Sequence, residues 1–190
     1  MYLAKHHQTG ASLIEVLVAI LLLSFGMLAL GSMLSFAVQA PKLSILRTAA
    51  VNIANSHVER IRANPEGFAK ADGTGGSYAA SLHDTSWSNT QITASNQCTY
   101  PDCTAQTVAT MDIEDTRMAI RRQLPAGDMV TKCSTTPCIK TSYGELWVIW
   151  KEPSTVSLLS SSSDNCPSEL TSSYYGTEPP RCLYIRFKVE

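Results

Sequence analysis

The chain has 190 residues, of which 44% are hydrophobic, and its 15 Lys plus Arg nearly balance its 16 Asp plus Glu. This length predicts one domain, or one domain with an appendage. The balanced charge excludes the basic footprint of a nucleic-acid-binding protein. The sequence also lacks a nucleophile elbow, a Walker loop and an HExxH motif, so we expect no enzyme, no catalytic residue, no metal and no cofactor.

An apolar run lies near the N-terminus. Residues 16 to 41 contain no Asp, Glu, Lys or Arg, and Glu15 stands immediately before them. A helix of that length would span roughly 39 Å, which is enough to cross a hydrocarbon core of about 30 Å. A cleaved signal peptide is the competing interpretation, because residues 37 to 40 (AVQA) have the small side chains of a cleavage site. The length of the run, Glu15 and Pro41 oppose it, so we expect a transmembrane helix.

The charges beside this run predict its orientation. Lys5 precedes it, together with two histidines, and no acidic residue precedes Glu15. Basic residues favour the cytoplasmic side, so the N-terminus should remain in the cytoplasm and the rest of the chain should lie outside.

A second helical pattern follows the apolar run. Apolar residues recur at helical spacing after Pro41, at Leu43, Leu46, Ala50, Ile53, Val58 and Ile61. The helix should end near Ala63, because Asn64 precedes Pro65. We therefore expect one long helix with an apolar half and an amphipathic half, kinked at Pro41.

The remainder predicts a sheet with few helices. Residues 68 to 109 are rich in Gly, Ser, Thr and Asn and indicate a loop. The stretch 114–127 resembles a short helix that starts at Asp115 or Thr116 and stops before Pro125. Strand patterns cover 128–133, 145–151 and 183–190, and their alternation predicts a sheet with one buried face. The expected fold class is α+β, with the long N-terminal helix packed on a C-terminal antiparallel sheet.

Other polar residues have ordinary interpretations. His57 on the amphipathic helix and His83 in a loop are predicted to be core or surface histidines. Asp112, Glu114 and Asp115 lack EF-hand spacing and are predicted to form a charge cluster at a helix N-terminus.

Six cysteines follow the apolar run, and their spacing does not suggest zinc. An even number outside the membrane fits disulfides in an oxidising compartment. The six allow 15 pairings, and sequence does not choose among them. Local spacing favours one pairing, because two pairs bracket short Pro-containing segments; free thiols remain the alternative. These pairs are Cys98 with Cys103, Cys133 with Cys138, and Cys166 with Cys182.

The string GASLIEVLVA at residues 10 to 19 resembles the processing signal of type IV pilins and pseudopilins. In that family a prepilin peptidase cuts after the Gly and methylates the new N-terminus. The resemblance implies cleavage between Gly10 and Ala11 and N-methylation of Ala11, although most pilins begin with Phe. It also implies a cleaved leader (1–10), a transmembrane and assembly helix (11–41), an amphipathic half (42–64) and a periplasmic disulfide-bearing domain (65–190).

The same resemblance gives Glu15 a role as the assembly charge partner of the N-terminal ammonium of a neighbouring subunit. That pairing would make a buried carboxylate tolerable in an apolar filament core. Gly26 and Gly31 lie inside the run, where local softening and close helix packing are equally good interpretations.

Three further segments resemble the minor pilins called PilV, or type IV pilus modification proteins. They are SHVERIRAN, RRQLPAG, which is similar to a pattern containing LPGG, and LWVIW. The resemblance implies a minor pilin that helps a priming or tip complex to initiate pilus polymerisation, with roles in twitching motility and adhesion. A pseudopilin that drives exoprotein export by type II secretion is the alternative.

The implied partners are other minor pilins, the major pilin, the prepilin peptidase and the inner-membrane assembly platform, with a tip adhesin as a further candidate. The implied location is the inner membrane, with one span and the C-terminal domain in the periplasm, and then the pilus fibre.

Overall fold

The computed structural model describes residues 12–70, 75–95, 97–99, 101–135, 138–152, 164–176 and 180–189, without the side chains of Phe36, Gln39 and Ala40. The chain divides into two compact units, residues 1–43 and 44–190. The Ser-rich stretch at 160–163 lies outside the described residues.

Helix α1 (Leu13–Ala63) contributes to both units and ends at the predicted residue. Its part Leu13–Ser35 is long and apolar enough to cross a membrane, although a signal sequence would meet the same criterion. Pro41 lies inside the helix, which is helical on both sides of it. A kink at Pro41 stays a prediction.

Two helices follow α1 in the second unit. The short α2 (Pro65–Phe68) starts after Asn64, whose side chain accepts a hydrogen bond from the Gly67 N–H. Helix α3 (Ala105–Gln123) ends before Pro125 as predicted, but it begins about ten residues earlier than the predicted start. Thr104 and Thr107 form a capping box at its start, in which the side chain of each accepts a hydrogen bond from the backbone N–H of the other. Sequence patterns missed this start because the surrounding composition is typical of a loop.

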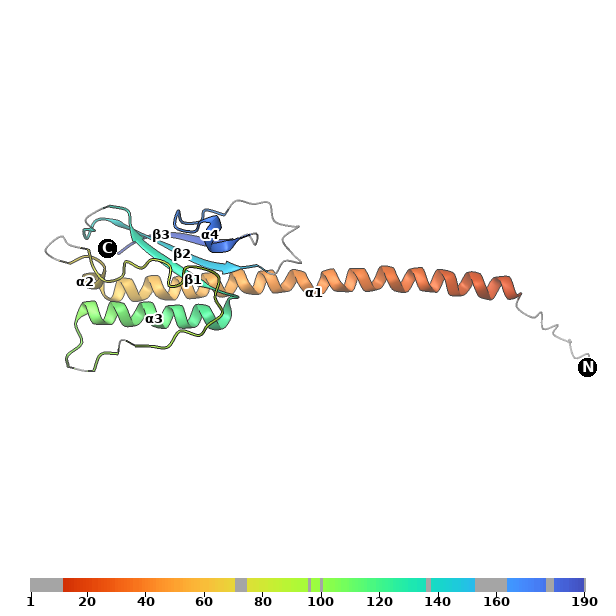
Figure 1. The fold of residues 1–190 in the computed structure, drawn as a ribbon, viewed down its shortest axis with the longest axis horizontal. Coiled ribbons are helices and arrows are strands. Elements are labelled where there is room, and N and C mark those ends of the chain that lie inside the picture. Colours follow the sequence, from red (N-terminus) through yellow and green to blue (C-terminus); the bar gives the residue numbers. More distant parts are fainter. Residues whose placement is uncertain are drawn as a thin grey trace, which may run out of the picture. The chain divides into compact units, whose positions relative to one another are not determined.

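The sheet has the predicted antiparallel pattern. Strands β1 (Asp128–Cys133), β2 (Tyr143–Lys151) and β3 (Pro180–Lys188) pair in the order β1-β2-β3, and the one-turn helix α4 (Ser172–Tyr175) precedes β3. In the register, Val130 lies opposite Trp147, and Trp147 lies opposite Tyr184. In Figure 1 the strands are drawn above the C-terminal part of α1, and α3 is drawn below it. The α+β fold class is confirmed.

One face of the sheet packs on the helices. The buried residues of this first core come from the second half of α1, from α3 and from the strands, and include Ala54, Val58, Ile61, Ile113, Ile120, Leu146, Val148, Trp150 and Phe187. The amphipathic half of α1 therefore packs in the core of the second unit through its apolar stripe. Burial of each large apolar side chain contributes roughly 1.5–3 kcal/mol to stability.

The opposite face of the sheet is buried as well, so the prediction of one buried face was wrong. Trp147 and Ile149 of β2 pack there with Leu170 and Tyr174. Leu146 to Trp150 are all buried, and such an unbroken apolar run is typical of a strand covered on both sides. The segment carrying α4 supplies the cover.

Three disulfides staple this unit. They join Cys98 to Cys103, Cys133 to Cys138 and Cys166 to Cys182, with Cα separations of 5.2, 5.7 and 5.3 Å. This is the pairing that local spacing favoured. The third bond ties the segment before α4 to β3.

Candidate assembly segment and the domain that carries it

Glu15 is an exposed residue in the first turn of α1. Its backbone N–H donates to the Ser12 carbonyl oxygen at 2.9 Å. A carboxylate in a first turn interacts favourably with the partial positive charge of the helix N-terminus. Gly10 and Ala11, the predicted cleavage and methylation residues, lie outside the described residues.

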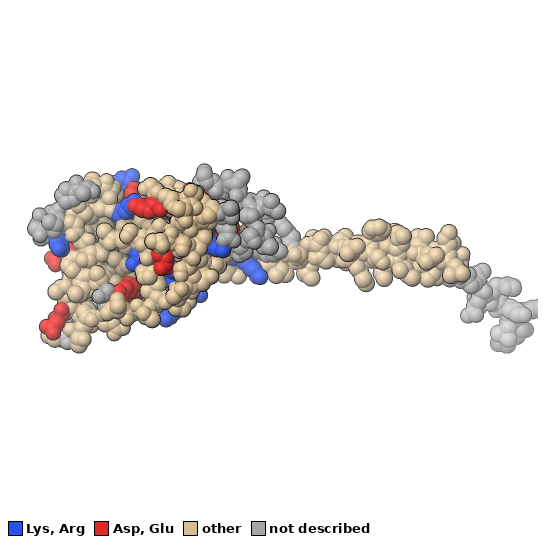
Figure 2. Space-filling model, in the orientation of Figure 1, with Lys and Arg blue, Asp and Glu red and all other residues tan. Residues whose placement is uncertain are grey.

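The N-terminal part of α1, around and after Glu15, exposes large apolar side chains. Leu13 is 84% exposed and Leu28 is 72% exposed. Figure 2 shows this segment as a surface without visible charge. Exposed apolar area of this extent indicates burial against lipid or protein rather than water. A side chain at Gly26 or Gly31 would meet nothing within 4 Å, so no contact in the chain requires glycine there.

A polar cluster joins α1 to α3 in the second unit. Arg60 Nη1 donates to Asp112 Oδ1 at 3.0 Å and to Asp115 Oδ2 at 3.2 Å. The Tyr78 hydroxyl donates to Asp112 Oδ2 at 2.5 Å, and burial together with this bond raises the Tyr78 pKa. The acidic residues therefore lie in the middle of α3, and their predicted place at a helix N-terminus was wrong. Sequence could not show this role, because Arg60 and Asp112 are 52 positions apart.

His57 is a fully buried neighbour of this cluster. Its Nδ1 lies 2.8 Å from Thr116 Oγ1, and the Thr116 hydroxyl donates to the Asp112 carbonyl. Because that hydroxyl proton is already used, His57 Nδ1 carries the hydrogen and Nε2 is the unprotonated acceptor. Burial, with the nearby charges of Arg60 and Arg117, lowers the His57 pKa to about 4. His57 is therefore a neutral core residue. The sequence alone predicted either a core or a surface histidine.

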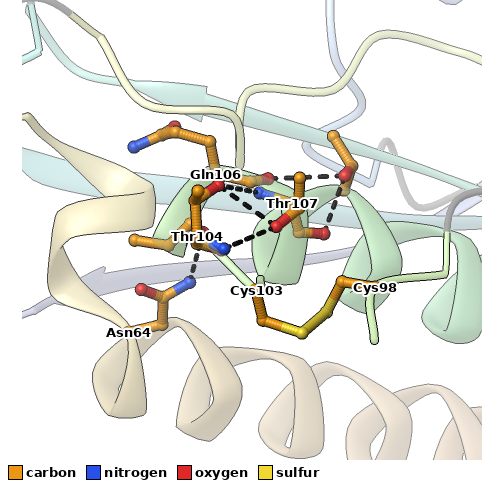
Figure 3. The surroundings of a disulfide bond; sticks show 8 residues. Asn64, Cys98, Cys103, Thr104, Gln106 and Thr107 are labelled. Atoms are coloured by element: carbon orange, nitrogen blue, oxygen red, sulfur yellow. Dashed lines mark hydrogen bonds between the residues drawn. A yellow bond between two sulfur atoms is a disulfide. The ribbon is translucent and has the colours of Figure 1, made fainter. Parts of the chain in front are cut away.

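The first disulfide lies where α3 begins (Figure 3). Cys103 immediately precedes the capping residue Thr104. Across from it, the Asn64 side chain donates to the Ala105 carbonyl oxygen at 2.7 Å. A hydrogen bond therefore joins the end of α1 to the start of α3, next to the loop that the Cys98–Cys103 disulfide closes.

Two buried arginines, Arg121 and Arg181, and the partly buried Arg117 form ion pairs in this unit. Arg121 forms a close ion pair with Asp84, and Arg181 forms a close ion pair with Glu152. Arg117 lies 3.7 Å from Asp128. Pattern reasoning missed these pairs, and the first two join residues that are 37 and 29 positions apart in the sequence. In the part of the chain that the structure describes, no cluster of His, Cys, Asp or Glu could hold a metal ion.

Two family models match the chain. Residues 5–31 match the prokaryotic N-terminal methylation motif. Residues 33–114 match the family described as Type IV pilin Tt1218. The chain is a type IV pilin-like protein. A search of curated proteins and a search of solved structures gave no significant match.

The methylation-motif match spans the residues around the predicted cut, from the leader to beyond the middle of the apolar run. A pilin-like chain of this kind is a structural pilin-type subunit with a membrane anchor. The family indicates assembly with other pilins and processing by a prepilin peptidase. The narrower likeness to PilV is not confirmed by either match.

Proposed function

We propose that this pilin-like subunit is a minor pilin of a type IV pilus, which joins other minor pilins in a complex that primes polymerisation. The observation that carries the proposal is an exposed apolar helix that begins with a single carboxylate, in the same chain as a domain stapled by three disulfides. The exposed apolar surface needs a bilayer before assembly and neighbouring subunits afterwards.

We also propose how the chain is processed and placed. The prepilin peptidase removes residues 1–10 and methylates Ala11. Residues 11–41 span the inner membrane once, the amphipathic half (42–64) follows, and the domain (65–190) folds in the periplasm before entering the fibre. Disulfides support the periplasmic location, because they persist in oxidising compartments.

In the proposed filament, Glu15 neutralises the N-terminal ammonium of a neighbour. Both groups leave water or the headgroup region for an apolar core, and an unpaired charge there would be costly. The exposure of Glu15 in the single chain leaves its carboxylate available to another subunit.

Deleting the gene tests the proposal against the alternative of a type II secretion pseudopilin. We expect loss of surface pili and twitching, normal exoprotein secretion, and recovery when the intact gene is returned. Normal pili and motility in the deletion strain would contradict the minor-pilin function. A secretion defect in their place would favour the pseudopilin.

Mass spectrometry of the mature N-terminus tests the processing. We expect a chain that starts at Ala11 and carries one added methyl group. A Gly10→Val variant should retain its leader, because the cut depends on that glycine in the family. A wild-type chain that still begins at Met1 in assembled fibres would contradict the processing scheme.

A further inference from the structure

A short extended segment lies along the free edge of strand β1. Ala80 N–H donates to the Thr131 carbonyl at 2.9 Å, and Thr131 N–H donates to the Ala80 carbonyl at 2.8 Å. A residue that makes both bonds of such an antiparallel pair turns both of its backbone groups toward its partner strand, while its two neighbours turn theirs away. The backbone groups of Ala79 and Ser81 therefore point away from β1.

One face of α3 lies opposite this outer edge. Arg117 Nη2 makes a short hydrogen bond to the Ser81 carbonyl oxygen, which shows that the outer edge faces the helix. A cleft of about 390 Å³ separates the two walls. Its extended wall consists of Ser77 and residues 79–83, and its helical wall consists of Thr110, Ile113, Glu114 and Arg117.

The extended wall offers unused backbone groups to the cleft. Within the described residues, the Ala79 N–H, the Ala79 carbonyl and the Ser81 N–H have no hydrogen-bond partner. These three groups have the spacing of one strand edge, so an added strand could pair with all of them. The Ser81 carbonyl would keep its bond to Arg117.

We propose that this cleft binds an extended segment of another pilin subunit by strand addition. Backbone pairing would supply affinity, and the helical wall would select side chains that fit between Thr110 and Arg117. The volume is within the range of about 300–1,000 Å³ found for ligand-binding clefts.

The occupant follows from the charges and from the proposed function, on which this inference rests. Glu114 and Arg117 put opposite charges on one wall, so the cleft does not favour a polyanion. An assembled pilin holds its neighbours at high local concentration, which lets a few backbone hydrogen bonds suffice.

Photo-crosslinking in cells that assemble the full chain tests the proposal. Benzoylphenylalanine replaces Ser81 in the cleft, and the matched control places it at Arg122, an exposed α3 residue outside the lining. We expect the position-81 adduct to map, by mass spectrometry, to one segment of another pilin subunit. The position-122 variant should not yield that adduct.

Two blocking variants are then added to the position-81 chain. Thr110→Trp fills the cleft from the helix and Ala79→Trp fills it from the opposite wall, whereas Arg122→Trp adds the same bulk elsewhere. Each blocking variant should reduce the adduct about tenfold, the effect of losing one or two net backbone hydrogen bonds. The use of two walls guards against a single variant that fails to fold.

Three results would overturn strand addition: no pilin adduct at position 81, an adduct only to lipid or to a protein that is not a pilin, or an adduct insensitive to both blocking variants. The gene deletion separates this failure from failure of the proposed function. Lost pili in the deletion strain without a cleft adduct would refute strand addition alone.

Discussion

Glu15 begins a helix whose next charged residue is Lys42. A carboxylate at this position would be tolerated at a headgroup, but its role in assembly requires a cationic partner from outside the chain. Among the charged groups that the structure describes, none forms an ion pair with it. Its function is therefore tested by assembly rather than by folding.

Replacing Glu15 with Gln removes the charge and keeps the size of the side chain. We expect normal processing, but a loss of incorporation into sheared fibres of at least about tenfold, since an unpaired buried charge costs about 3–5 kcal/mol. Immunoblots of fibre and membrane fractions measure this loss. Glu59→Gln, which changes an exposed carboxylate farther along α1, is the matched control. Equal incorporation of both variants would contradict the charge-pairing role.

His57 makes the stability of the domain depend on pH. Its pKa falls from 6.5 to about 4 on folding, so the unfolded chain binds the proton more tightly between these values. The stabilisation associated with neutral His57 is present above the unfolded pKa and is lost as the pH falls through the folded one. At about 1.36 kcal/mol per pKa unit, the loss is roughly 3 kcal/mol.

A His57→Gln variant should lack this component of the pH dependence. Urea unfolding of wild type and variant at pH 7 and pH 4 measures the difference in free energy of unfolding. We expect wild type to lose about 3 kcal/mol more than the variant between the two pH values. Equal losses would show that His57 is not the responsible group.

Ala126 has a φ of 49°, in the left-handed region. It follows Pro125 after α3, and its N–H donates to the Asn89 side chain at 2.8 Å. In the LPGG pattern that RRQLPAG resembles, glycine occupies this position, which suits a left-handed residue. The hydrogen bond that the Ala126 N–H donates to the distant Asn89 side chain helps to hold the alanine in this conformation.

At the scale of elements, α3 was only partly predictable. Its second half has regular apolar spacing, and Pro125 marks where it must stop. Its first half contains two threonines, Thr107 and Thr110, which are weak helix formers. Burial of Ala109 and Ile113 in the first core, together with the Thr104 cap, stabilises these turns. Tertiary packing therefore outweighs local propensity.

Gly144 on β2 lies opposite Phe187 on β3, and a Cβ at this glycine would overlap the Phe187 ring. Gly144→Ala should therefore destabilise the domain by about 1–3 kcal/mol, as overpacking does. Thermal unfolding followed by circular dichroism measures it. Gly144→Ala combined with Phe187→Leu should recover part of the loss.

The matched control is Gly75→Ala, where an added Cβ would meet its nearest atom, the Cys138 Cβ, at 3.8 Å. It should change stability by less than about 1 kcal/mol. A Gly144→Ala variant as stable as the control would mean that the Phe187 ring moves aside without loss.

At the scale of the molecule, the third disulfide closes the largest covalent loop. Cys166 and Cys182 are separated by 16 positions, and the loop carries Leu170 and Tyr174 onto the second face of the sheet. Replacing both cysteines by Ser should cost about 3 kcal/mol, against about 2 kcal/mol for the shorter loop of Cys98 and Cys103. Urea unfolding of both double variants compares the losses. A greater loss for the shorter loop would contradict this ranking.

The two units differ in the surroundings that they require. Between Leu13 and Val38 the first unit exposes large apolar side chains, which other molecules must cover, whereas the second unit buries two cores of its own. The methylation-motif match at residues 5–31 lies within the first unit, and the pilin-family match at residues 33–114 extends from the first unit into the second. Membrane anchoring and pilin-type assembly explain why the first unit exposes an apolar helix. The second unit folds around its own buried cores.

Local patterns were sufficient to predict the long helix to Ala63, all three strands, the α+β class and the pilin-like N-terminus, because periodicity, charge and processing motifs are encoded over a few neighbouring residues. The pairing of the cysteines was favoured by spacing and observed in the fold. Three features could be known only from the tertiary structure: the early start of α3, the burial of both sheet faces, and the cluster of Arg60, Tyr78 and Asp112. Each depends on partners brought together from distant positions, and the free energy of such contacts leaves no local trace in the sequence.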